Sequence, residues 1–168
     1  MTNDESQDVR EVIEALARSP NEAARLLRDL SEQALKARNS PDEFSALENI
    51  CHLRDIEVEG YTVRVNKILT ENKPILPDID GGRLAIDRAY NNQNVDEALE
   101  TFALARQQNV VVLMQINDEQ LKRSGFMTGV GEMTLEKLLV MMRDHDEDHL
   151  EELRRIRQQT LKSSFSEF

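Results

Sequence analysis

The sequence DHDEDH, at residues 144–149, contains two of the three histidines in this chain of 168 residues. His145 and His149 are four residues apart, so in a helix both imidazoles lie on one face, one turn from each other. Apolar side chains continue the same stripe at steps of three and four, at Leu138, Met142, Leu153 and Ile156. The pattern predicts a last helix, capped by Thr134, whose histidines point into the protein interior.

The third histidine, His52, lies far upstream in a second helical segment. Ser45 to Glu48 has the form of a capping box, and no Gly or Pro follows until Gly60, so we predict a long helix from Ser45 to about residue 72. Residues 40–43 (SPDE) are an alternative capping box for the start of this helix. One polar stripe runs along this helix, formed by Glu48, His52, Asp55 and Glu59. If the two helices are neighbours, all three histidines converge.

Three imidazoles that leave one position open are a typical catalytic metal site. The alternative is that each histidine is a core residue satisfied by a hydrogen bond. Burying adjacent imidazoles costs a few kcal/mol unless they are partnered, and one shared cation satisfies them together. We therefore predict that His52, His145 and His149 bind a divalent metal. Glu48, one turn before His52, is a fourth ligand or a hydrogen-bond acceptor in this hypothesis.

Other chemistries are less well supported. The spacing of His145 and His149 is that of the H-E-x-x-H zinc-protease motif, but Asp146 replaces the Glu and no third ligand follows in a known arrangement. Cys51 lies about 100° around the helix from His52, so it faces away from the histidines. We interpret it as a small buried apolar residue instead of a metal ligand or nucleophile. A solvated outer face is the simplest interpretation of the acids at Asp144, Asp146, Glu147, Asp148, Glu151 and Glu152.

The rest of the chain predicts further helices. A first helix should break at residues 19–22 (SPNE), followed by a short helix to about residue 30 and a loop over 36–43. Residues 73–93 form a long crossover with a short helix over 83–90, a connection that often covers a site. Asn94 caps a third helix to about residue 117, and a turn-rich link with a hairpin near Phe126 and Met127 follows. The predicted fold is all-α, a four-helix bundle with a long crossover and short extra helices.

The composition predicts one domain, over residues 8–160, between a flexible segment (1–7) and a polar tail (161–168). With 21 basic and 32 acidic residues the net charge is −11, which disfavours nucleic acid and anionic lipid as partners. No apolar run approaches the roughly 18 residues of a membrane span, and residues 1–10 do not resemble a signal peptide. A single cysteine excludes an internal disulfide. We therefore expect a cytoplasmic protein.

Two segments resemble the DinB-like superfamily, which includes the YfiT-type proteins. They are FSALENICHLRDIE (44–57) and GEMTLEKL (131–138), the latter followed by His145 and His149. The order of one histidine on the second main helix, a long crossover and H-x-x-x-H on the last helix is specific to that family. The resemblance covers about residues 8–159. Phe44 stands where the family usually has Trp, a difference that affects packing more than chemistry.

The resemblance implies a four-helix bundle in which His52, His145 and His149 bind zinc or nickel. Several relatives are transferases or isomerases that use bacillithiol, mycothiol or glutathione. We therefore expect an enzyme in which the metal presents a small-molecule thiolate to a small-molecule electrophile, with Glu48 or Asp55 as proton acceptor and the crossover shaping the pocket. The alternatives are a hydrolase with water as nucleophile, or a non-catalytic module stapled by the metal. A homodimer is a further family-level expectation.

Overall fold

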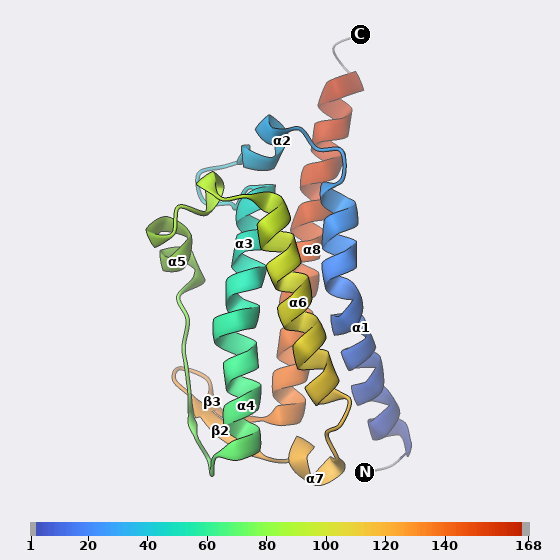
Figure 1. Ribbon diagram of the computed structural model, residues 1–168, viewed down its shortest axis with the longest axis vertical. Coiled ribbons are helices and arrows are strands. Elements are labelled where there is room, and N and C mark those ends of the chain that lie inside the picture. Colours follow the sequence, from blue (N-terminus) through green and yellow to red (C-terminus); the bar gives the residue numbers. More distant parts are fainter. Residues whose placement is uncertain (1–2, 166–168) are drawn as a thin grey trace.

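The computed structural model describes residues 3–165, with side chains for residues 9–162. Four long helices lie side by side along the long axis of the molecule (Figure 1). They are α1 (Asn3–Leu27), a long second helix from Ala46 to Thr70, α6 (Val95–Leu113) and α8 (Leu135–Phe165). The predicted four-helix bundle is confirmed. The predicted terminal segments extend beyond the described residues, and the predicted domain limits stay predictions.

The second helix begins where the capping box predicts. The Ser45 hydroxyl accepts the backbone N–H of Glu48 at 3.1 Å, and the Glu48 carboxylate accepts that of Ser45 at 2.8 Å. The helix consists of α3 (Ala46–Asp55), a π-helical segment η1 (Ile56–Tyr61) and α4 (Thr62–Thr70). The backbone N–H of Thr62 donates to the carbonyl of Glu57, five residues back. The apolar periodicity does not predict this wide turn, which often marks a functional site.

The predicted break at residues 19–22 is wrong, because α1 continues through Pro20. Proline has no N–H, so the carbonyl of Leu16, four residues earlier, loses its helical partner. The guanidinium of Arg106, on α6, donates to this carbonyl from Nη1 at 2.9 Å. A residue far along the chain therefore supplies the hydrogen bond that Pro20 removes. The chain turns only after Leu27, near Asp29, whose φ is +66°.

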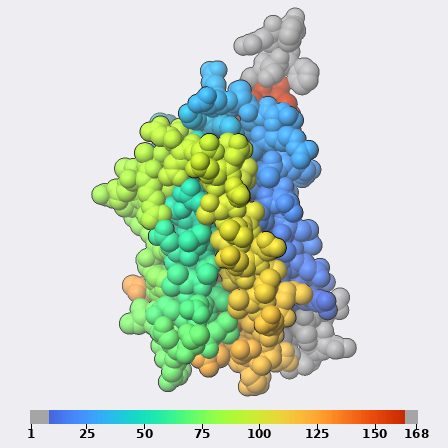
Figure 2. All heavy atoms as spheres, viewed as in Figure 1, coloured from blue at the N-terminus to red at the C-terminus, as the bar shows by residue number. Residues whose placement is uncertain are grey.

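The crossover is long because α6 runs in the same direction as the second helix (Figure 1). The chain must return over the length of that helix, roughly 35–40 Å at 1.5 Å per residue. It does so through β1 (Ile75–Leu76), α5 (Gly81–Asp87) and the 3₁₀ turn η2 (Tyr90–Asn92). Figure 2 shows this segment along the flank of the second helix. The side chain of Asn94 caps α6, as predicted.

Short elements close the two ends of the bundle. Near one end lies α2 (Glu32–Lys36); at the other, α7 (Asp118–Leu121) precedes a hairpin of β2 (Ser124–Met127) and β3 (Gly131–Thr134). The predicted hairpin is confirmed, and β1 joins it parallel to β2, with Ile75 opposite Phe126. The Thr134 hydroxyl then accepts the Lys137 N–H at 3.2 Å, so the predicted cap of α8 is confirmed.

The core consists of two apolar clusters separated by a polar layer. One cluster includes Leu16, Ile68 and Met142, and the other includes Leu47, Phe102 and Leu150. Buried polar side chains lie between them, at His52, Glu57, Arg106, Asn109 and Asp146. Among the described helices, none is long and apolar enough to cross a bilayer. The middle of the bundle therefore contains buried polar and charged side chains between the two apolar clusters.

Candidate metal centre

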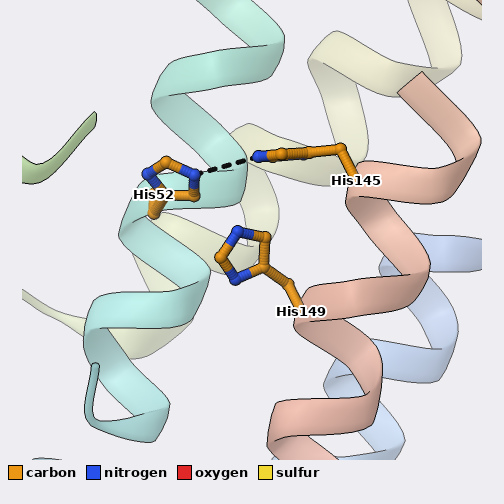
Figure 3. Close-up of side chains that lie close together, drawn as sticks. All are labelled: His52, His145 and His149. Atoms are coloured by element: carbon orange, nitrogen blue, oxygen red, sulfur yellow. Dashed lines mark hydrogen bonds between the residues drawn. The ribbon is translucent and has the colours of Figure 1, made fainter. Parts of the chain in front are cut away.

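The three histidines meet inside the bundle, as predicted from their spacing. His52 extends from α3 toward His145 and His149 on α8 (Figure 3). The Nε2 atoms of His52 and His145 are 3.0 Å apart, and one ring nitrogen from each of the three residues lies within 4.8 Å of the others. Two nitrogens on one tetrahedral zinc are about 3.3 Å apart. The spacing of the three side chains therefore suits a single divalent cation.

The protonation state of these rings also fits a metal. The Nε2 atoms of His52 and His145 face each other, and their Nδ1 atoms are buried without a hydrogen-bond partner among the described residues. Burial, and then the neighbouring His149, lowers the pKa of His52 to about 4 and that of His145 to about 2. Both rings are therefore neutral near pH 7, the form that binds metals. Each ring turns its Nε2 toward the other, so a cation between them would be held by the two Nε2 lone pairs, with each ring proton on Nδ1.

Asn49 orients His149, and the sequence pattern does not point to it. The Asn49 side-chain amide donates from Nδ2 to the carbonyl of Ser45 at 3.0 Å, which leaves Oδ1 as an acceptor. This oxygen is 2.6 Å from Nδ1 of His149. The His149 Nδ1–H therefore donates to Asn49, and the Nε2 lone pair is available to a cation. The only sequence signal is its place one turn before His52, on the same helix face.

Replacing Asn49 with leucine should lower zinc affinity by about 10- to 100-fold, because His149 Nδ1 loses its nearer acceptor and keeps only Glu152 Oε2, at 3.5 Å. Asn49 is fully buried, and leucine has the same number and branching of side-chain heavy atoms. Competition with a coloured chelator measures the affinity. Asn49→Asp keeps the acceptor oxygen and should retain zinc. Equal zinc affinity in folded Asn49→Leu and wild type would mean that Asn49 does not position the ligand.

The two predicted proton acceptors are already occupied. Burial raises the pKa of Glu48, but hydrogen bonds from Arg38 and Ser45 outweigh it, so the net shift is downward. Both Glu48 carboxylate oxygens accept from Arg38, and one also accepts from the Ser45 backbone. Glu48 therefore belongs to a helix cap and an ion pair.

Asp55 is occupied in the same way. Burial raises its pKa, but hydrogen bonds from Arg54, Tyr90 and Arg88 outweigh this effect, so the net shift is downward. One oxygen accepts from Arg54 at 2.6 Å, and the other from Arg88 at 2.6 Å and Tyr90 at 2.7 Å. Neither predicted acceptor thus has an oxygen free of hydrogen bonds.

Asp146 does not belong to a solvated face, so that part of the sequence interpretation is wrong. Its side chain is buried against Arg106, which also contacts Glu57 at 2.9 Å. Asn109 donates to the other oxygen of Glu57 at 3.1 Å. Since Asp146 is paired to Arg106, it is also not available as the general base that a zinc-protease motif requires. The other predicted outer acids are exposed, apart from the half-buried Glu152.

Two further groups cover the histidines. The Phe44 ring lies 5.4 Å from that of His52 and stacks on His149 at 6.4 Å, measured between centroids. The crossover approaches from another direction, where Gly81 packs on His52 so closely that a Cβ atom there would be 2.3 Å from Cε1 of the ring. Cys51 is buried, and burial raises the pKa of its thiol to about 11, which agrees with the predicted role as a small core residue.

A family model described as DinB superfamily matches residues 15–153, most of the chain and all three histidines. The chain belongs to the DinB superfamily. Its fold matches a solved superfamily structure, YfiT from Bacillus subtilis, described as a probable metal-dependent hydrolase with an unusual four-helix bundle topology. The TM-score is 0.85 at 17% identity, over 92% of this chain and 88% of YfiT. No curated protein matches the chain. The resemblance seen in the sequence is thus confirmed for the family and the fold.

Proposed function

We propose that this DinB-superfamily protein is a metal-dependent enzyme that activates a low-molecular-weight thiol for attack on a small electrophile. The observation that carries the proposal is the convergence of His52, His145 and His149, with one ring nitrogen of each within 4.8 Å. The description of YfiT as a probable metal-dependent hydrolase supports a divalent metal. Imidazole ligands suit zinc and nickel, the two ions that the family resemblance implies.

Each surrounding residue has a role in this proposal. His52, His145 and His149 bind the cation in their neutral forms, and Asn49 holds the tautomer of His149. Phe44 excludes water from the faces of two imidazoles. A divalent cation held by three neutral ligands keeps its full charge, leaves a position open, and lowers the pKa of a coordinated thiol or water.

A thiol is preferred to water because of the state of the nearby carboxylates. Glu48 and Asp55 both hold arginines, so neither has an oxygen free to accept a proton. A thiol with an ordinary pKa of about 8.5 needs a smaller shift than water to ionise near neutral pH. Chemistry that needs no protein base therefore suits this site better. The description of YfiT favours the second candidate, a metal-dependent hydrolase.

The remaining expectations stay proposals from the sequence and the family. They are a small-molecule substrate, no nucleic acid or membrane partner, a homodimer and a cytoplasmic location. A non-catalytic metal staple is the third alternative. Such a site is normally closed by four protein ligands, whereas only three His, Cys, Asp or Glu side chains meet here within the described residues.

Elemental analysis of tag-free wild type beside His145→Ala tests the metal. We expect about one equivalent of zinc or nickel per wild-type chain and little in the variant. Asp144→Ala, next to this ligand but exposed, is the matched control and should keep the metal. Wild-type protein that is empty and takes up neither ion on titration would contradict the proposal.

Activity assays on the metal-loaded protein then separate the candidates. Conjugation of 1-chloro-2,4-dinitrobenzene with bacillithiol, mycothiol or glutathione reports thiol transfer, and hydrolysis of p-nitrophenyl acetate without thiol reports a hydrolase. The activity should disappear in His52→Ala. Metal removal that lowers the melting temperature in a protein without either activity would favour the structural staple.

A further inference from the structure

Arg64, on α4, is a buried cation without a carboxylate partner. Its side chain is only 6% exposed, and among the described residues it forms no ion pair, although the chain has 32 acidic side chains. By contrast, the buried Arg106 and the partly buried Arg54 each contact carboxylates. Burying an unpaired charge is costly, so this guanidinium requires a partner that the described residues do not supply.

Arg64 lies beside the histidine cluster. Its guanidinium carbon is 5.4 Å from the centre of the Tyr61 ring, and that ring is 5.7 Å from the ring of His145. The guanidinium carbon is therefore no farther from the centre of the His145 ring than the sum of these two distances. Its charge also contributes to the lowered pKa of His145, after larger effects from burial, His149, His52 and Arg106.

The crossover connects Arg64 to the cluster from the other side. Nε of Arg64 donates to the carbonyl of Pro77 at 3.0 Å, and four residues later Gly81 packs on His52. Four extended residues span at most about 14 Å. Arg64 and His52 therefore contact the two ends of one short strip of backbone.

The outer nitrogens of Arg64 are free to bind. Nε has its partner in Pro77, whereas the two Nη atoms have none in the described residues. The buried side-chain atoms without a partner are His52 Nδ1, Thr62 Oγ1, Arg106 Nε and His145 Nδ1, so the Nη atoms of Arg64 still reach solvent. Gly60 faces Nη1 without a side chain of its own, and a Cβ there would be 3.7 Å away.

We propose that Arg64 binds a carboxylate of the substrate while the reacting end of the substrate lies at the three histidines. A guanidinium edge with two free N–H groups matches a carboxylate in geometry. A single cation near the exposed Asp78 suits a group of one negative charge better than a dianionic phosphate. The inference rests on the proposed function, because it names the substrate class for that centre: small carboxylic acids whose second functional group reacts.

Calorimetric titration of zinc-loaded protein tests this inference. The probes are dicarboxylates of increasing length, succinate, glutarate and adipate, each paired with the monocarboxylate of equal chain length. At the best length we expect the dicarboxylate to bind about tenfold tighter than its partner, because one carboxylate reaches the metal and the other reaches Arg64. Two equivalent ends alone give a twofold advantage, so no larger advantage at any length would overturn the proposal.

Variants separate recognition from a structural role. Arg64→Met should reduce the tenfold preference to about twofold, and Arg64→Lys should keep part of it because the charge remains. Arg83→Met, on the exposed crossover helix, makes the same change of charge and should keep the full preference. Variants that melt earlier but keep the wild-type preference would show that Arg64 is only structural.

The metal content, measured first, separates this inference from the proposed function. If the protein takes up no metal, the proposed function fails, and the same dicarboxylates are titrated into metal-free wild type and Arg64→Met. Binding by the wild type that Arg64→Met loses supports an Arg64 carboxylate site on its own. Equal binding, or none, overturns it.

Discussion

Replacing Arg106 with methionine should lower the free energy of unfolding by about 3–5 kcal/mol, because it leaves buried charges without a partner. The guanidinium contacts Asp146 and Glu57, which are 2% and 0% exposed, and also the Leu16 carbonyl that Pro20 leaves free. Methionine keeps the bulk of the side chain but none of these hydrogen bonds. Urea unfolding of metal-free protein, followed by circular dichroism, measures the change without a contribution from metal binding.

The surface pair of Arg143 and Asp144 provides the control. Arg143→Met should change stability by less than about 0.5 kcal/mol, because water screens exposed ion pairs. A triple variant, Arg106→Met with Glu57→Gln and Asp146→Asn, should recover much of the loss, since no uncompensated charge remains buried. A loss of under about 1 kcal/mol in Arg106→Met alone would show that this polar layer does not hold the bundle together.

This network also explains where prediction from the sequence fails. Each confirmed helix start depends on residues close in sequence: Ser45 with Glu48, Asn94 with the following N–H groups, and Thr134 with Lys137. The expected break at Pro20 also depends only on neighbouring residues. In the structure, Arg106 bonds to the carbonyl that Pro20 leaves free, and the helix continues. Asp146 is placed inside the bundle by the same arginine. A partner that lies far along the chain leaves no trace in a local pattern.

The residues of the metal centre fall into the same two groups, those that a local sequence pattern predicts and those that it does not. His52, His145 and His149 could be predicted as a group because helical spacing and an apolar stripe fix the direction of each side chain. The groups that complete the site, Asn49 and Gly81, could not. Asn49 acts through an amide whose orientation depends on the Ser45 carbonyl. Gly81 matters because it has no side chain, which lets the crossover pack directly on His52. The π-helical turn at residues 56–61 could likewise not be predicted, since the apolar pattern passes through it unchanged.

Replacing Gly81 with alanine should weaken zinc binding by about 100-fold or more, although alanine is the better helix former. A Cβ atom at position 81 would lie 2.3 Å from Cε1 and 2.6 Å from Nδ1 of His52. Contacts this short cannot form, so either the His52 ring or the crossover must move, and displaced ligands bind metals poorly. Competition with a chelator measures the affinity, and elemental analysis measures the metal content.

Gly82→Ala is the matched control, one residue further along the same helix. A Cβ atom there meets only Asp80 Oδ1, at 3.5 Å, which is ordinary contact, so this variant should keep wild-type zinc affinity and gain slightly in stability. A loss specific to Gly81→Ala would mean that the crossover fixes His52 in its ligating position. If both variants bind zinc like the wild type, the crossover yields at little cost, and the positions of the three histidines are determined by the bundle helices alone.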